Sequence, residues 1–149
     1  MPFVDSENDR LRDITRIILG RTEAEWKREH ALDVLRQGQH VDEALELLQA
    51  SYQAEDEPIV DASIRKVSLR GEDWHSVFMG VLDLFSPADR PVTTGVLDYV
   101  YRQTRCSLCR NHLVQLIADK SVLSDDVIEE CLLDSYDETR EFASHFLSS

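Results

Sequence analysis

Apolar residues recur every three to four positions along most of this chain, and this period constrains the fold more than any other feature. It is the period of an α-helix that buries one face. The first two stripes are Leu11, Ile14, Ile17 and Ile18, then Trp26, Ala31, Leu32 and Leu35. Only four prolines and five glycines interrupt 149 residues, and no long stretch alternates as a half-buried strand does. The sequence therefore predicts an all-α fold.

Capping residues and helix breakers divide the chain into separate helices. Thr22–Glu25 reads TEAE, a capping box that opens a helix, and Gly38 is expected to end that helix. Pro58 fits the first turn of a helix that Gly71 ends. Further helices are expected from 41, over 74–85, 92–101 and 106–120, from Ser124, and from the capping box SYDE at Ser135–Glu138. The length suits one domain over 1–149, with N-terminal helices in 1–40.

Three segments repeat a local pattern. They are Asp56–Ile64 (DEPIVDASI), Asp89–Leu97 (DRPVTTGVL) and Asp137–His145 (DETREFASH). Each begins with Asp, which can cap a helix, and the first two have Pro at the third position. The seventh position is always small (Ala62, Gly95 and Ala143), and we expect this residue to admit a neighbouring helix.

This pattern resembles the HEAT and armadillo-like repeat family, in which the second helix of each pair commonly opens with Asp and Pro. The third segment lacks the Pro but keeps Asp137, Arg140 and Ala143. The resemblance covers roughly residues 41–147 and implies a short right-handed α-solenoid of HEAT-like helix pairs. The alternative is an irregular helical bundle whose caps look alike because helix caps share a chemistry.

Cys106–His112, which reads CSLCRNH, holds two of the three cysteines. On a helix, Cys106 and Cys109 fall in the apolar stripe of Leu113, Leu116 and Ile117, so we expect both to be buried, metal-free core residues. A zinc site from Cys106, Cys109, His112 and Cys131 is one alternative. A redox or sensing thiol pair, with Arg105 and Arg110 nearby, is the other.

The net charge limits the partners. There are 29 acidic and 16 basic residues, for a formal charge of −13, which repels nucleic acid and anionic membranes and attracts basic proteins. No apolar run approaches the ~20 residues that cross a bilayer, and residues 1–10 lack a signal-peptide pattern. Three cysteines cannot form a closed set of disulfides. We therefore expect a cytoplasmic protein that binds neither nucleic acid nor membranes.

Negative charge is densest between Asp125 and Glu141, where the acids exceed the single base, Arg140, by seven. Such a region is either a solvated surface with helix caps or a contact surface for a basic partner. The candidate contact residues are Asp125, Asp126, Glu129, Glu130, Asp134, Asp137, Glu138 and Glu141.

The sequence contains no HExxH, GxSxG or Gly-rich phosphate motif. We therefore expect neither a catalytic site nor a cofactor. The leading hypothesis is a non-enzymatic protein–protein interaction module, the role that the HEAT-like resemblance implies. A bacterial immunity protein or other inhibitor that masks a basic partner is a narrower alternative. The third hypothesis is a metal-binding or redox-sensing protein that uses Cys106 and Cys109.

Overall fold

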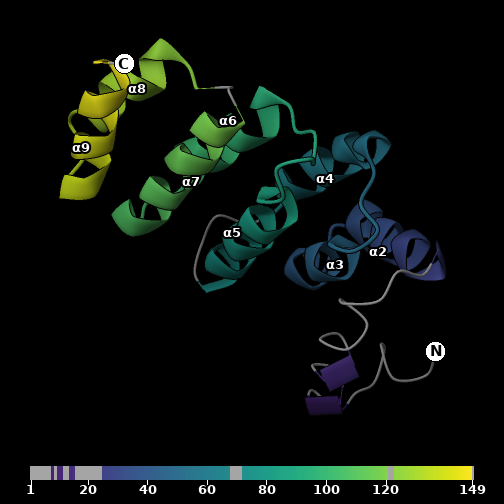
Figure 1. Cartoon of the computed structure of the whole chain (residues 1–149). Helices are drawn as coiled ribbons and strands as arrows, with labels where there is room; N and C mark the ends of the chain where they lie inside the picture. Colours follow the sequence, from purple (N-terminus) through teal and green to yellow (C-terminus); the bar gives the residue numbers. More distant parts are fainter. Residues whose placement is uncertain are drawn as a thin grey trace. The chain divides into compact units, whose positions relative to one another are not determined.

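The structure is a computed structural model that describes residues 8, 10–11, 14–15, 25–67, 72–120 and 123–148. These residues form helices and no strand, which confirms the predicted all-α class. The described elements are α2 (Glu25–Gln37), α3 (Val41–Leu48), the 3₁₀ turn η1 (Ala54–Asp56), α4 (Glu57–Ile64), α5 (Glu72–Phe85), α6 (Thr94–Gln103), α7 (Ser107–Asp119), α8 (Asp125–Cys131) and α9 (Asp137–Phe146), as shown in Figure 1.

The chain divides into two compact units, Met1–Pro87 and Ala88–Ser149. Each is described by itself, and the single domain over 1–149 stays a prediction. Some of the predicted features lie outside the described residues: Ile17, Ile18, residues 22–24 of the TEAE box, and Gly71.

In the first unit, α3 packs against α2 and α5, and α4 packs against α2. The contact is apolar, because each helix turns one stripe of residues inward. The fully buried side chains include Leu35, Leu45, Leu48, Ile64, Phe78 and Phe85. The stripe prediction holds for Ala31, Leu32 and Leu35, but Trp26 is 39% exposed at the beginning of α2. Leu11 and Ile14 are also exposed.

Local chemistry explains where two of these helices begin and end. Helix α2 ends directly before Gly38, as predicted: Gly38 has a φ of 70°, and its N–H donates to the carbonyls of Val34 and Leu35. Pro58 lies in the first turn of α4, also as predicted. Asp56, directly before α4, is buried and accepts hydrogen bonds from the Gln53 N–H and from Arg28 of α2. Asp56 therefore fixes the start of α4 on α2.

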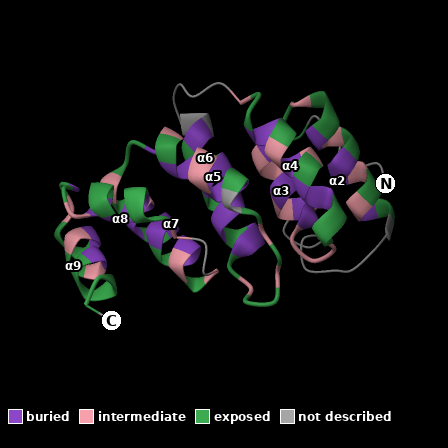
Figure 2. Cartoon of the chain, turned by 90° about the horizontal axis from the view of Figure 1, so that it is seen from above, coloured by how far each residue is buried: buried purple, intermediate pink, exposed green. Residues whose placement is uncertain are grey.

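In the second unit, α7 packs against α6 and α9, and α8 packs against α9. Its core is again a set of inward apolar stripes, and Figure 2 shows buried and exposed positions sharing each helix. The buried residues include Leu97, Val100, Leu113, Ile117, Val127, Ile128 and Ala143. This unit also contains buried polar groups, the side chains of Tyr101 and Asp134, which contact Arg110.

The small residues of the repeat pattern do not all have the expected role. Ala143 is buried, but Ala62 and Gly95 are exposed, so the expectation that they admit a neighbouring helix is wrong. The close approach occurs instead at Gly80 of α5. A Cβ added at Gly80 would lie 3.1 Å from both Cβ and Cδ1 of Leu45 in α3. Gly80 therefore sets how closely α5 and α3 pack.

We predict that Gly80→Val destabilises the protein by about 2 kcal/mol, because the added methyl groups overpack the contact with Leu45. Gly95→Val is the matched control, since Gly95 is also helical but exposed, and a Cβ there meets only Thr93 Oγ1 at 3.8 Å. Urea unfolding followed by circular dichroism measures both variants. Equal midpoints for the two variants would contradict the assigned role of Gly80.

Candidate functional site

Arg110 of α7 is the centre of a polar cluster in the second unit. Its Nη2 donates to the Tyr101 hydroxyl of α6 at 2.7 Å, and its guanidinium carbon lies 4.8 Å from the centre of the Tyr101 ring. Its Nε lies 3.3 Å from Asp134 Oδ2, and Nη2 lies 4.0 Å from Glu130 Oε2 of α8. One side chain on α7 thus contacts α6, α8 and the loop before α9.

Tyr101 passes the hydrogen bond on to Cys131. Its hydroxyl accepts from Arg110 and also hydrogen bonds with Cys131 Sγ at 3.6 Å, where either group can be the donor. Burial, followed by this hydrogen bond, raises the pKa of Tyr101. Burial also raises the pKa of the Cys131 thiol, which is fully enclosed. Both pKa shifts favour the neutral forms of Tyr101 and Cys131.

Asp134 departs from the expected acidic surface. Its side chain is 3% exposed and is paired with Arg110, and it also accepts a hydrogen bond from the Tyr136 N–H at 3.0 Å. Arg140 Nη1 donates to its backbone carbonyl at 2.6 Å. A carboxylate enclosed in this way holds the start of α9 rather than facing a partner. Asp134 is therefore left out of the candidate contact surface.

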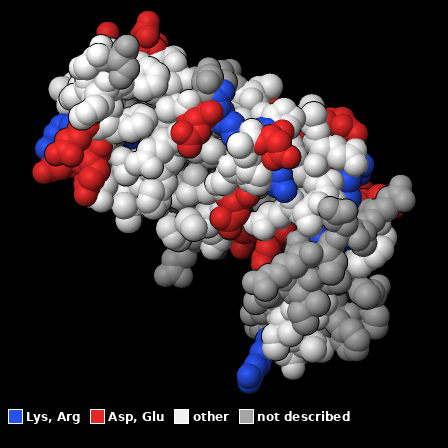
Figure 3. Space-filling view, in the orientation of Figure 1, with Lys and Arg blue, Asp and Glu red and all other residues white. Residues whose placement is uncertain are grey.

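The other seven candidate acids are exposed, and Figure 3 shows acidic side chains over α8 and α9. Some of them bound a surface hollow of about 350 Å³ beside α8. The hollow is lined by Arg102, Asp126, Glu129, Glu130 and Leu133. Two helices contribute: Arg102 comes from α6, and the three acids come from α8.

Leu133 is the most exposed large apolar residue of the described chain, at 87%. It lies just after α8, and its neighbours in the hollow are charged. Beside it, Arg102 is bound by Asp98 at 2.9 Å and lies 3.9 Å from Glu130. No sequence pattern singles out Leu133, because an apolar residue beside a helix is ordinarily assigned to the core.

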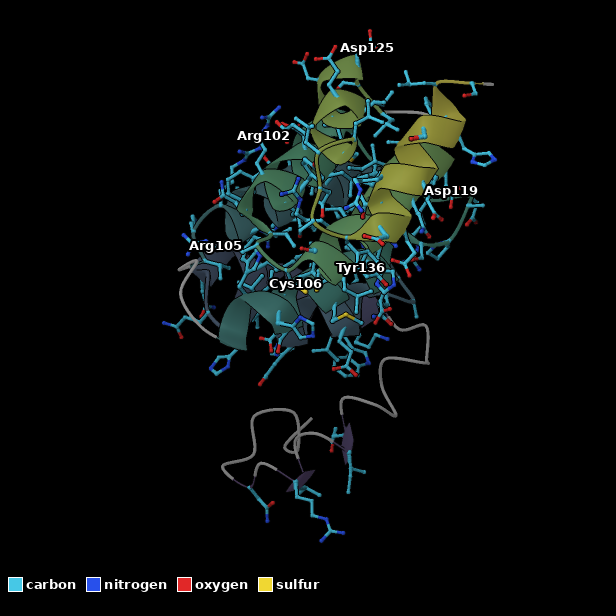
Figure 4. All side chains as sticks on the ribbon, turned by 90° about the vertical axis from the view of Figure 1, so that its left-hand side faces the viewer. Arg102, Arg105, Cys106, Asp119, Asp125 and Tyr136 are labelled. Carbon is cyan, nitrogen blue, oxygen red and sulfur yellow. The ribbon has the colours of Figure 1, made fainter. Side chains whose placement is uncertain are left out.

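The two cysteines of CSLCRNH do not share one environment. Cys109 is 5% exposed, as predicted, but Cys106 is exposed, so its predicted burial is wrong. The reason is the start of α7. The helix begins at Ser107, and Cys106 is the N-cap residue, with an extended backbone (φ −75°, ψ 118°) that removes it from the apolar stripe. Figure 4 labels Cys106 near Arg105 and Tyr136.

The alternative zinc ligands Cys106, Cys109, His112 and Cys131 all lie in the described residues. The structure does not bring them together: within that part of the chain, no three or more His, Cys, Asp or Glu side chains are placed to hold a metal ion. His112 is exposed on α7, whereas Cys131 is enclosed beside Tyr101. The zinc alternative therefore has no geometric support in these residues.

Comparison with protein-family models, with curated proteins and with solved structures finds no match for this chain. Among the described helices, none combines the length and the apolar character that a membrane span requires.

We predict that Asp134→Ala lowers the free energy of unfolding by about 2 kcal/mol, because it removes the buried partner of Arg110 and the acceptor of the Tyr136 N–H. Asp137→Ala is the control: Asp137 pairs with Arg140 at 2.6 Å, but its side chain is 76% exposed, so we expect less than about 1 kcal/mol. Urea unfolding measures both. An Asp134→Ala variant as stable as wild type would remove Asp134 from the structural framework.

Proposed function

We propose that this chain is a non-enzymatic protein-binding module that docks a basic partner on the acidic surface of its second unit. The observation that carries the proposal is the hollow beside α8, where the exposed Leu133 lies among Asp126, Glu129 and Glu130. The acidic side chains attract any protein of positive charge, so they do not by themselves distinguish one basic partner from another. An apolar side chain at the same place supplies a contact that charge alone does not.

The two kinds of contact act at different stages of binding. Acidic side chains raise the association rate of a basic partner and orient it. Covering a leucine contributes about 1.5–3 kcal/mol when burial is complete, and this contribution slows dissociation. The matching chemistry in the partner is a lysine or arginine next to a large apolar side chain.

The positive charge of Arg102 does not repel a basic partner strongly, because Arg102 is already paired with acids of the protein itself. Asp98 of its own helix binds its Nε, and Glu130 lies near its Nη1. Among the described residues, Asp126 and Glu129 form no ion pair with a basic side chain, and Asp126 acts on Arg102 only from a greater distance, so these two acids are the ones best placed to meet a cation. Glu130 contacts both Arg102 and Arg110, so replacing it also disturbs the fold.

A HEAT-like solenoid is the finer form of this proposal. Two of the Asp-led helices contact the helix directly before them in the chain, α4 with α3 and α9 with α8, in the order that the repeat pattern predicts. Asp56 and Asp137 lie at the starts of α4 and α9, where the repeat pattern puts them. An inhibitor that covers a basic surface of an enzyme falls within the proposal, and so does a non-inhibitory scaffold.

The test uses peptides selected from a random display library on the full chain. We predict that the selected peptides combine Lys or Arg with a large apolar residue and that their association rate falls as salt rises, since the Debye length shrinks from about 30 Å at 0.01 M to about 8 Å at 0.15 M. Glu129→Lys should reduce the association rate severalfold. Leu133→Ser should raise the dissociation rate about tenfold.

Two controls on the first unit match these substitutions. Asp83→Lys makes the same charge change at an exposed position of α5, and Met79→Ser removes a 41% exposed apolar side chain from the same helix. Neither should affect peptide binding. The proposal is wrong if the library yields no basic peptides, or if the peptides bind equally well to all four variants and at all salt concentrations.

A further inference from the structure

Cys106 and Cys109 form an unequal pair at the beginning of α7. Cys106 is the exposed N-cap residue, and Cys109 is the third residue of the helix and is buried. In a helix start, the N-cap side chain lies over the N–H groups of the second and third residues. Cys106 makes no side-chain cap hydrogen bond, but it lies three residues before Cys109 at the start of one helix, so the two side chains are neighbours.

The helix start stabilises a thiolate on Cys106 specifically. The backbone N–H of Cys109 and then its thiol, both on the side of the Cys106 sulfur, lower the pKa of the Cys106 thiol. The partial positive charge at a helix N-terminus acts in the same direction. Burial and the hydrogen bond to Cys106 raise the pKa of Cys109 to about 11. The Cys106 sulfur is thus accessible and is the better nucleophile, whereas Cys109 is a buried, protonated thiol.

The geometry also permits a bond between the two sulfurs. Side chains three residues apart on a helix have Cβ atoms roughly 5–6 Å apart, and a disulfide needs about 4 Å. Cys106 has an extended backbone outside the helix, so a small rotation at this residue closes the gap without unwinding α7. Cys131 cannot take its place, because it is fully buried against Tyr101.

We propose that Cys106 and Cys109 are a reversible dithiol site that reacts with low-molecular-weight disulfides by thiol–disulfide exchange. In the first step the Cys106 thiolate attacks one sulfur of the disulfide RSSR, the S–S bond of RSSR breaks, and RS⁻ leaves. In the second step the Cys109 thiol loses its proton and attacks Cys106 Sγ in the mixed disulfide, and the second RS⁻ leaves. The two RS⁻ ions take up the two protons that Cys106 and Cys109 have lost. The cysteine pair is thus oxidised to a disulfide, and RSSR is reduced to two RSH.

This site is independent of the docking surface. Its residues do not line the hollow beside α8, and the exchange reaction requires no macromolecular partner. The failure of either proposal therefore leaves the other standing.

The test treats the reduced full chain with glutathione disulfide, blocks free thiols at intervals with an alkylating agent, and maps the products by mass spectrometry. We predict a Cys106–Cys109 disulfide that dithiothreitol reverses. In Cys109→Ser, the glutathione mixed disulfide should accumulate on Cys106. In Cys106→Ser, Cys109 should form its mixed disulfide at least about tenfold more slowly, because its thiol is buried and protonated.

Cys131→Ser is the matched control, since it removes a thiol but keeps a hydrogen-bond partner for Tyr101, and we expect the wild-type disulfide to form in it. Circular dichroism of each variant separates a lost reaction from a lost fold. Equal reactivity of Cys106 and Cys109 in the folded single variants would overturn the proposal. So would the absence of an internal disulfide in a chain whose Cys106 does react.

Discussion

The contacts of the Arg110 side chain determine how the helices of the second unit are held together. A guanidinium carries several donors in a fixed plane, so one side chain can bind several elements at once. Here it contacts the hydroxyl and ring of Tyr101, the carboxylate of Asp134 and one carboxylate oxygen of Glu130. These groups belong to α6, to α8 and to the loop that leads into α9. The apolar stripes bring the helices together, and the Arg110 cluster fixes how they meet.

The same cluster relates the two proposed surfaces to one part of the chain. Glu130 belongs both to the Arg110 cluster and to the hollow that contains Leu133. Cys109 precedes Arg110 directly in α7. Because α7 is fixed at Arg110, the N-terminal turn that holds Cys106 also has a fixed position, and Ser107 supports it further through a 2.7 Å hydrogen bond to Ser135. A rigid support keeps reactive and contact groups in a defined geometry.

The acidic region shows how far sequence reasoning can go. The excess of carboxylates between Asp125 and Glu141 is visible in the sequence, and seven of the eight acids are indeed exposed. The eighth, Asp134, lies in a loop, where no helical period indicates which way a side chain faces. Its burial depends on Arg110, which is 24 residues earlier in the chain. A long-range pair of this kind leaves no local pattern in the sequence.

The helices can be predicted from the sequence, because their apolar period, the Gly38 end and the Pro58 start depend on residues only a few positions apart. Tertiary packing determines which of their side chains are exposed and which are buried. A shift of one residue in the start of α7 moved Cys106 from the apolar stripe to an exposed cap, and the packing of α8 left Leu133 in solvent. Helix formation is local, whereas exposure depends on which surfaces the other helices cover.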